Sequence, residues 1–287
     1  MNIKKHIKKK LNSYNRLAIW GSGEMAKQAY NEWLPKNKIQ SIVDSNIDKV
    51  GKDFKDKKII SPRDLDISEI DCVVVCTTAY NEVLEILSDK YNKIEYFFIL
   101  ELLPSNKDTK NEIDNLFLDI AVAKRYNWLS FLNERPQIIV NIFYRITKFC
   151  ESKIILRPLY WIMSIFYKII CIIFSVDLPL SVKIGPGFLL AHLGHVVFHP
   201  STNIGSFVTI YQNVTIGSND TGGVPILKNF VTVFHDSSVI GNSEIKSYCR
   251  VGAKSLVIDL KSEEASTIYG IPAKIQKTFN WYKKKLS

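Results

Sequence analysis

The chain has 287 residues, 46% of them hydrophobic and 23% charged, so it is long enough for two globular domains and too apolar for a disordered protein. Its formal net charge of +10 favours an anionic partner, such as nucleotide phosphates or an anionic membrane face, although basic segments at the two ends supply much of the excess. Five scattered cysteines argue against a disulfide framework and indicate a reduced, cytosolic protein. The segment 11–16 is polar where a signal peptide would be apolar, so we expect a cytoplasmic location.

The first 105 residues alternate short apolar runs with helical stretches. Runs with the composition of strands lie at residues 16–20, 39–44, 57–60, 71–77 and 93–99. Helical spacing follows the first run to about Trp33 and recurs between Tyr80 and Lys90. Strands that alternate with helices form a parallel sheet. The sequence therefore predicts an α/β, Rossmann-like domain over residues 1–105.

A glycine turn, GSGEMA, follows the first of these strands. Gly21 and Gly23 would let the backbone approach a phosphate at a helix N-terminus, where unpaired N–H groups and the helix dipole favour anions. Asp44 closes the second strand, where a ribose-binding acid would lie. Ala26 replaces the third glycine of such motifs. Binding of a nucleotide or nucleotide-sugar is therefore weighed against a docking domain that has kept the fold and lost the ligand.

Residues 106–178 form a predicted helical connector that becomes increasingly apolar. The stretch 159–176 is long enough to cross a membrane, but Arg157 and Pro158 at its start and Lys168 in its middle argue against a span. Aromatic and basic side chains along it suit helices that lie in a membrane interface. Packing of the helices on one another or across an oligomer interface explains the pattern equally well.

The last third of the chain has a period of six residues. Aliphatic or aromatic residues recur at Leu227, Val233, Val239, Ile245, Val251 and Val257, at Ile184, Leu190 and Val196, and at Phe198, Ile204, Ile210 and Ile216. This period is typical of a parallel β-helix, in which each short strand places one side chain in the core. Small or branched residues stand four positions later, at Val208, Val214, Val231, Ser237, Ser243, Cys249 and Ser255. We expect a narrow prism with about eighteen residues in each turn.

Two kinds of interruption accompany the repeat. Glycines follow the inward position directly at Gly185, Gly205, Gly217 and Gly252, where a corner would need backbone freedom. The segment SNDTGG, residues 218–223, breaks the period and predicts a loop extruded from the coil. Such loops commonly border binding sites.

Three of the five histidines lie in the segment AHLGHVVFH, at His192, His195 and His199. A histidine can accept a proton from a hydroxyl and return it to a leaving group, most effectively when a carboxylate orients its ring. Asp177 is the nearest upstream acid, and fifteen residues on a turn of about eighteen would bring it near His192. The three histidines lack the spacing and the partner ligands of a zinc site, so we expect no metal.

The ordered segments VDLPLSVKIGPGFLLAH, TIYQNVTIG, VIGNSEI and YGIPAKI resemble the catalytic domain of the serine acetyltransferase family, particularly its branch associated with surface polysaccharide synthesis. The resemblance covers roughly Val176 to Ile275. It implies a left-handed β-helix, a homotrimer, and acetyl-CoA or another acyl-CoA bound between subunits. It also implies that His192 is the general base and that Asp177 is its partner. The cofactor-binding positions that it implies are Gly217, Phe234, His235, Gly252, Ala253, Pro272, Ala273 and Lys274.

The chain departs from that family at the positions that hold free serine. Ala191 stands where serine acetyltransferases carry an acid that meets the substrate amine, and GGVPILKN lacks the arginine-histidine pair that meets the serine carboxylate. The residues that would face an acceptor are then Ala191 and His195. Phe234 and His235 occupy positions that are usually glycine and alanine. These departures favour a sugar hydroxyl over serine as the acceptor.

The leading hypothesis is an acetyl-CoA-dependent O-acetyltransferase of a sugar or glycan in capsule, exopolysaccharide or lipopolysaccharide synthesis, peripheral to the cytosolic face of the inner membrane. One alternative is an N-acetyltransferase of a nucleotide-linked amino sugar held by the N-terminal domain; another is serine O-acetyltransferase. A non-catalytic trimeric scaffold in a membrane assembly is the alternative from a different class. The expected organisation is a Rossmann-like domain at 1–105, a connector at 106–178, a β-helix acyltransferase domain at 179–275 and a basic tail at 276–287. No nucleic-acid partner is expected.

Overall fold

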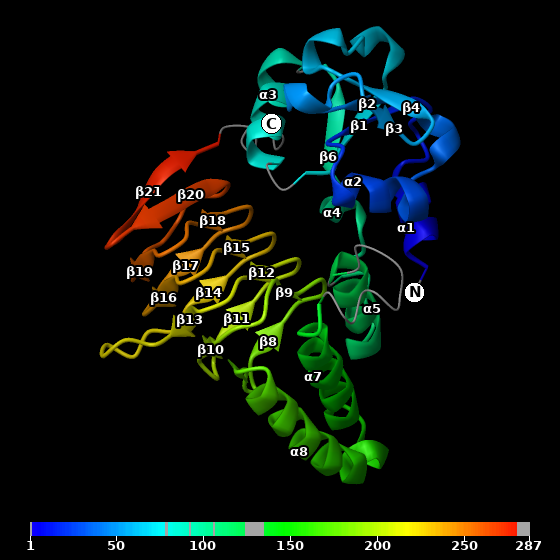
Figure 1. Ribbon diagram of the computed structural model, residues 1–287. Helices are drawn as coiled ribbons and strands as arrows, with labels where there is room; N and C mark the ends of the chain where they lie inside the picture. Colours follow the sequence, from blue (N-terminus) through cyan, green and yellow to red (C-terminus); the bar gives the residue numbers. More distant parts are fainter. Residues whose placement is uncertain (1, 78–79, 92, 106, 124–134, 280–287) are drawn as a thin grey trace. The chain divides into compact units, whose positions relative to one another are not determined.

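A computed structural model describes residues 2–77, 80–91, 93–105, 107–123 and 135–279. The chain divides into two compact units (Figure 1). The first unit contains the described residues up to Pro104 together with Phe279. The second unit runs from Ser105 to Thr278. The predicted connector therefore belongs to the same compact unit as the β-helix. Each unit is described by itself.

The first unit is built on a sheet of six strands in the order β3-β4-β2-β1-β5-β6. All neighbours are parallel except the short edge strand β3, which pairs antiparallel with β4. The strands are β1 Leu17–Trp20, β2 Ile39–Val43, β3 Asp53–Phe54, β4 Lys57–Ile60, β5 Cys72–Val75 and β6 Glu95–Phe98. The central strands β1 and β5 are buried at every residue, as continuous apolar runs require in a covered parallel sheet. The strands predicted from the apolar runs are all present.

Helices and short helical turns connect these strands. They are α1 Ile3–Lys10, α2 Glu24–Gln28, the π-helix η1 Ala29–Trp33, α3 Tyr80–Lys90 and α4 Ile99–Leu102, with 3₁₀ turns at η2 Lys36–Lys38, η3 Ile47–Lys49, η4 Pro62–Asp64 and η5 Ile67–Glu69. The helical stretch predicted to end near Trp33 thus has only five residues of α-helix before it widens into the π-helix.

The second unit contains a parallel β-helix with three sheets, one on each side of the coil (Figure 1). One sheet has the order β19-β16-β13-β10-β7, another β17-β14-β11-β8, and the third β21-β20-β18-β15-β12-β9. Their bounds are β7 Val176–Asp177, β8 Lys183–Ile184, β9 Leu189–Leu190, β10 Val196–Phe198, β11 Asn203–Ile204, β12 Thr209–Ile210, β13 Val214–Gly217, β14 Ile226–Leu227, β15 Thr232–Val233, β16 Ser238–Ile240, β17 Glu244–Ile245, β18 Arg250–Val251, β19 Leu256–Ile258, β20 Ser266–Gly270 and β21 Ala273–Thr278. The last strand extends three residues past the predicted boundary at 275.

The inward residues are those that the six-residue period selects. Every residue of the three predicted series is at most 8% exposed, and Val233, Val239, Ile245, Val251 and Val257 are fully buried. The small residues four positions later, such as Ser237 and Cys249, are buried as well. Narrow side chains at these positions allow the three walls to approach one another, so the hexapeptide pattern accounts for the core of the prism.

The turns of the coil differ in length, which corrects the expectation that each turn has about eighteen residues. Val196 pairs with Val214 eighteen residues later, whereas Asn203 pairs with Ile226 after twenty-three, because the loop at 218–223 is inserted between them. In the first turn, Leu189 pairs with Thr209 after twenty residues. The first turn therefore contains two residues more than the regular one.

None of the four glycines that follow inward positions has a positive φ angle, and two of them serve close packing between turns. A Cβ on Gly185 would lie 2.7 Å from the backbone of Gly205, and a Cβ on Gly205 would lie 2.6 Å from that of Lys228. A Cβ on Gly217 would meet nothing closer than 3.5 Å. Positive φ angles fall instead on larger residues at other corners, such as Phe207 at 57° and Asp236 at 58°. The prediction that these four glycines supply corner flexibility was therefore wrong.

In the described ranges 107–123 and 135–175, the helices that precede the coil are α5 Glu112–Ala123, α7 Ile138–Glu151 and α8 Arg157–Ile173, with the 3₁₀ turn η6 Ile154–Leu156 before α8. They lie at the end of the β-helix that holds its first turn (Figure 1). The continuous helical segment Ile154–Ile173 is long and apolar enough to cross a membrane by length and composition. Only 11% of the most apolar 18-residue stretch of this segment is buried.

Candidate active site

His192 lies in an enlarged corner of the first turn, between β9 and β10. Six residue steps separate Leu190 from Val196, whereas four separate the corresponding Ile210 and Val214 in the next turn. The two additional residues of the first turn are therefore in the corner that carries His192. Gly194 in this corner has a φ of 147°, and a Cβ there would lie 2.6 Å from Gln212. The enlargement leaves His192, Leu193 and His195 exposed on the edge of the prism.

Aromatic rings continue from His192 along this edge. The ring centroids of His192 and Tyr211 are 5.6 Å apart, and those of Tyr211 and Phe234 are 5.0 Å apart. The Arg250 guanidinium lies 5.5 Å from the Phe234 ring. Sequence reasoning did not single out Tyr211 or Arg250. The six-residue period contained a signal for Tyr211, because it follows the inward Ile210 as Ala191 follows Leu190.

The predicted cofactor-binding residues gather mostly on the same edge. Leu190, Ile210, Val233, Val251 and Ile268 pair in successive turns. The corner residues that follow them are Ala191 and His192, Tyr211 and Gln212, Phe234 and His235, Gly252 and Ala253, and finally Tyr269 and Gly270. Four of the predicted positions, Phe234, His235, Gly252 and Ala253, therefore stand in line with His192.

Pro272, Ala273 and Lys274 belong to the hairpin of β20 and β21, which continues the same sheet beyond β18. Lys274 is exposed and pairs with Tyr269. Gly217 is different, since it ends β13 in another sheet and precedes the extruded loop. The structure therefore does not place Gly217 with the other predicted cofactor-binding residues.

Asp177 lies on β7, where it pairs with Val197 of β10. His192 lies in the corner that leads into β10, so the acid is on the strand that pairs with β10 and the histidine is in the segment directly before β10. Both side chains are exposed. The longer first turn changes the register that the sequence predicted but keeps the two residues on neighbouring elements. Their pairing stays a prediction.

The other predicted side chains near this corner have different environments. The Nδ1 atom of His199 accepts a hydrogen bond from the Ser201 backbone N–H at 3.2 Å, which indicates a structural role. The Nδ1 atom of His235 lies 2.9 Å from Asp236 Oδ2, and hydrogen bonds to His235 and Asn213 lower the pKa of Asp236. Ala191 is 5% exposed, so its methyl group offers almost no surface to an acceptor, whereas His195 is exposed. No group of three metal-ligating side chains occurs among the described residues.

Helix α7 holds the first turn through a row of polar side chains that sequence reasoning missed. The N–H groups of the first turn donate to carbonyl groups of the second, for example Ala191 N to Ile210 O at 2.8 Å. The corresponding carbonyl groups of the first turn have no turn before them and would be unpaired. The N-cap residue of α7 and three residues within the helix satisfy them: Gln137 donates to Leu190 O and Ala191 O, Asn141 to Phe188 O, Tyr144 to Val182 O, and Arg145 to Ile184 O and Gly185 O. The spacing of four between Gln137, Asn141 and Arg145 places them on one face of the helix.

The charge of Arg145 is balanced by acids from α5. The Nε atom of Arg145 lies 2.9 Å from Asp119 Oδ2, and its Nη1 lies 2.8 Å from Glu112 Oε2. Arg145 and Asp119 are fully buried, and Asp119 also accepts the Phe188 N–H at 2.9 Å. This buried network fixes α5, α7 and the first turn to one another. Gln137 belongs to the same row and contacts the carbonyl group of Ala191, directly before His192.

The glycine turn of the first unit is closed by its own side chains. Asp44 Oδ2 accepts hydrogen bonds from Ser22 N at 2.9 Å and Ser22 Oγ at 2.5 Å, while Oδ1 accepts one from Asn46 N. Burial raises the pKa of Asp44, but these hydrogen bonds and Lys49 outweigh it, so the pKa is lowered. The predicted ribose acid is thus 8% exposed and already bound within the turn.

The two glycines of this turn differ in what they require. Gly21 has a φ of 109°, and a Cβ there would lie 2.6 Å from Cys76 O. It is therefore needed for the approach of β1 to the end of β5. A Cβ on Gly23 would meet nothing within 4 Å. Neither observation identifies a ligand, and nucleotide binding at Gly21, Gly23 and Asp44 stays a prediction.

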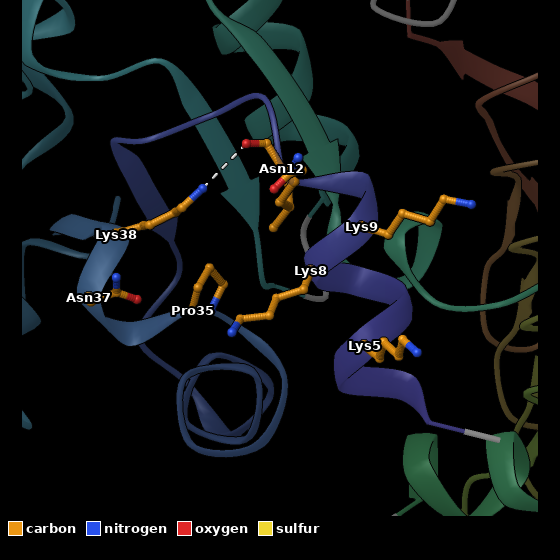
Figure 2. A pocket seen from close by; sticks show the side chains of 8 residues that line it. Lys5, Lys8, Lys9, Asn12, Pro35, Asn37 and Lys38 are labelled. Atoms are coloured by element: carbon orange, nitrogen blue, oxygen red, sulfur yellow. Dashed lines mark hydrogen bonds between the residues drawn. The ribbon is translucent and has the colours of Figure 1, made fainter.

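A basic pocket lies between α1 and the η2 turn of the first unit (Figure 2). It is lined by Lys5, Lys8, Lys9, Leu11, Asn12, Pro35, Asn37 and Lys38. Lys8 extends toward Pro35, whereas Lys5 and Lys9 extend away from it (Figure 2). Lys38 Nζ donates to the backbone oxygen of Tyr14 at 2.6 Å. The lysines give this surface a diffuse positive charge but do not converge on one point.

Comparison with known proteins finds different relatives for different parts of the chain. Residues 13–95 match a family model described as C2185-like, N-terminal. Over 109 residues, the chain is 34% identical to a serine acetyltransferase of Buchnera aphidicola subsp. Schizaphis graminum and 32% identical to that of Haemophilus influenzae. These alignments cover 37% of this chain and 41% and 40% of the two relatives. The chain therefore spans about two fifths of the length of the curated relatives that it matches.

Solved structures of serine acetyltransferases are also similar to this chain. The soybean apoenzyme is 24% identical and has a TM-score of 0.47 over 59% of this chain and 70% of that chain. A serine acetyltransferase in complex with CoA is 26% identical and has a TM-score of 0.47 over 57% of this chain and 69% of that chain.

Proposed function

We propose that the protein is an acetyl-CoA-dependent O-acetyltransferase with His192 as its general base. The observation that carries the proposal is the enlarged corner, which exposes His192 at the start of an edge formed by Tyr211, Phe234 and Gly252. A rigid coil that presents an imidazole at a fixed position provides the preorganisation that general-base catalysis needs. The relatives with matching sequence, which are serine acetyltransferases by name, support the same class of reaction.

In the proposed reaction, an imidazole nitrogen of His192 accepts the proton of the acceptor hydroxyl. The hydroxyl oxygen forms a bond to the thioester carbonyl carbon, the carbon–sulfur bond breaks, and the proton passes to the departing thiolate. The products are an acetyl ester and coenzyme A with a free thiol. Asp177 would orient the imidazole and stabilise its protonated form.

The edge beyond His192 has features that suit a long anionic cofactor. Ala253 is small and exposed on this edge, and the exposed Lys274 on the adjoining hairpin can meet phosphate groups. Phe234 and His235, which are usually small residues in the similar family, are held by Tyr211, Arg250 and Asp236. Their positions predict a cofactor that passes over an aromatic surface at this turn.

The named relatives favour serine as the acceptor, which the sequence analysis kept as an alternative, over the sugar hydroxyl that it ranked first. A sugar hydroxyl is the second candidate, and Ala191 is the observation in its favour. Its buried methyl group offers no charge to an amine where the similar family carries an acid. Roles in polysaccharide synthesis, a homotrimer and a nucleotide-sugar in the first unit remain proposals.

Thiol release from acetyl-CoA tests both parts of the proposal. The purified protein should release free coenzyme A only when a hydroxyl acceptor is present, and serine and a panel of free and nucleotide-linked sugars should be compared at equal concentration. Turnover with serine would select the first acceptor, and turnover with a sugar alone would select the second. If calorimetry detects no binding of coenzyme A and no acceptor releases thiol, the enzyme proposal is wrong and the scaffold alternative stands.

A further inference from the structure

Helix α8 buries one narrow stripe and leaves a wide apolar face uncovered. Tyr167 and Cys171 are buried, and Tyr160, Met163, Ile170 and Phe174 on the same side are partly buried. The residues exposed on the other side are Ile154, Ile155, Leu159, Trp161, Ile162, Ile165, Phe166, Ile169, Ile172 and Ile173. At about 100° per residue these side chains cover an arc of about 160°. An exposed apolar face of this extent marks an interaction surface.

The charged residues of this segment are all basic, and they lie at the border of the apolar face. No Asp or Glu occurs between Glu151 and Asp177, while Lys153, Arg157 and Lys168 are exposed. On the helical wheel, Arg157 and Lys168 fall between the buried stripe and Trp161. Long basic side chains at this border can reach lipid headgroups while the neighbouring apolar residues enter the acyl region.

We propose that this face, from Ile154 to Ile173, docks on an anionic lipid surface, with α8 lying in the plane of the interface. Charge complementarity favours this occupant over a second copy of the chain. In a two-fold contact between two α8 faces the same patch meets itself, so Arg157 and Lys168 of each copy would find no acid in the partner's segment to balance them. An anionic membrane supplies the missing negative charge and the apolar phase together.

The attachment of α8 favours an interfacial position over a membrane span. The Tyr167 hydroxyl donates to Leu178 O at 2.5 Å, and Thr147 Oγ1 of α7 lies 3.5 Å from Met163 O. The inner stripe is thus fixed along its length to α7 and the start of the coil, and Ile173 is followed after two residues by β7. A helix held in this way presents its outer side to a membrane while the β-helix stays in water.

Vesicle flotation of the full-length protein tests the proposal. Wild-type protein should float with vesicles that contain about a third of phosphatidylglycerol in phosphatidylcholine, and at least tenfold less should float with phosphatidylcholine alone or in 1 M salt. The double substitution Ile165→Asp and Ile169→Asp should reduce flotation at least tenfold, because both side chains are exposed and central to the face. The matched control is Ile47→Asp, an 83% exposed isoleucine of the first unit, which should float as wild type does.

Three results would overturn the proposal. Wild-type protein that fails to float with anionic vesicles removes the lipid partner, and if gel filtration then shows that the double variant has lost an oligomeric state, the face is a contact between copies. Flotation of the double variant at the wild-type level excludes this face as the contact. Protein that stays with vesicles through alkaline carbonate and high salt, and is released only by detergent, would be a spanning protein. Each of these results is separate from thiol release, which tests the enzyme proposal.

Discussion

Helices α7 and α8 are consecutive and both amphipathic, but the structure uses them in opposite ways. The inner face of α7 carries donors that bind the carbonyl groups of the first turn. The outer face of α8 is apolar and has no partner among the described residues of its unit. The comparison shows that the end of this β-helix needs hydrogen-bond donors as well as the apolar cover that both helices give it, because its unpaired carbonyl groups would otherwise lose solvation without compensation.

The largest effect should follow from removal of the Arg145 cation. Arg145→Met leaves the buried Asp119 carboxylate without its counter-ion and leaves Ile184 O and Gly185 O without a donor. We expect the free energy of unfolding of the second unit to fall by about 3–5 kcal/mol, measured by urea denaturation. Arg63→Met, at an exposed site of the first unit, should change it little. Equal stability of the two variants would show that the polar network does not hold α7 in place.

A smaller loss of stability, with a larger loss of activity, should follow from Gln137→Leu. The carbonyl groups of Leu190 and Ala191 would lose their donor at a cost of about 1–3 kcal/mol. Because Ala191 precedes His192, we also expect kcat for acetyl transfer to fall roughly tenfold to a hundredfold. The pKa in the pH–rate profile should stay unchanged, since Gln137 carries no charge. Gln40→Leu, at an exposed site of the first unit, is the control, and wild-type kcat in the Gln137 variant would separate α7 from catalysis.

Tyr167→Phe should cost about 1–2 kcal/mol, because it leaves Leu178 O without its hydrogen bond. Burial raises the pKa of Tyr167, so the hydroxyl stays protonated in the folded protein. Its contribution is therefore present below the unfolded tyrosine pKa of about 10 and is lost as the pH rises from there. Urea denaturation at pH 8 and pH 11 should show a difference between wild type and variant that shrinks at the higher pH. A difference that grows with pH would contradict this assignment.

The smallest effect is expected on the outer face of α8. Ile165→Asp should change the free energy of unfolding in solution by no more than about 0.5 kcal/mol, because the side chain is 63% exposed and contacts no core. Cys171→Asp, on the buried stripe of the same helix, should cost several kcal/mol. Thermal unfolding of the two variants without lipid gives the comparison directly. A large loss in Ile165→Asp would mean that this face is already packed within the protein.

The sequence predicts the parts of the fold that repeat. The six-residue series identifies the core residues of the coil, because the position of a residue within the period determines whether its side chain points inward. The alternating runs identify the strands of the first unit. The extended corner at His192 was also within reach, since the series that contains Leu190 ends at Val196 and the next one, which contains Ile210, begins only two residues later at Phe198. The assumption that every turn has about eighteen residues prevented this prediction.

Contacts between distant segments could not be predicted in the same way. The carbonyl groups that accept from Gln137 and Arg145 lie between 39 and 54 residues away along the chain, and no periodic pattern connects them. Asp44 is similar, because its place at the end of β2 was predicted correctly, but its bonds to Ser22 depend on how the turn folds back. Apolar composition alone also could not distinguish the buried side of α8 from its solvent-exposed side.

Substitution of His192 tests the central claim most directly. His192→Asn should lower kcat for thiol release from acetyl-CoA by about 10²–10⁴-fold, while calorimetry shows unchanged binding of coenzyme A. His199→Asn is the matched control in the same segment and should stay close to the wild-type rate, because His199 contacts the backbone of Ser201 and not the proposed site. Turnover of the His192 variant within a few fold of wild type would contradict the assignment of the general base and, with it, the account of the enlarged corner.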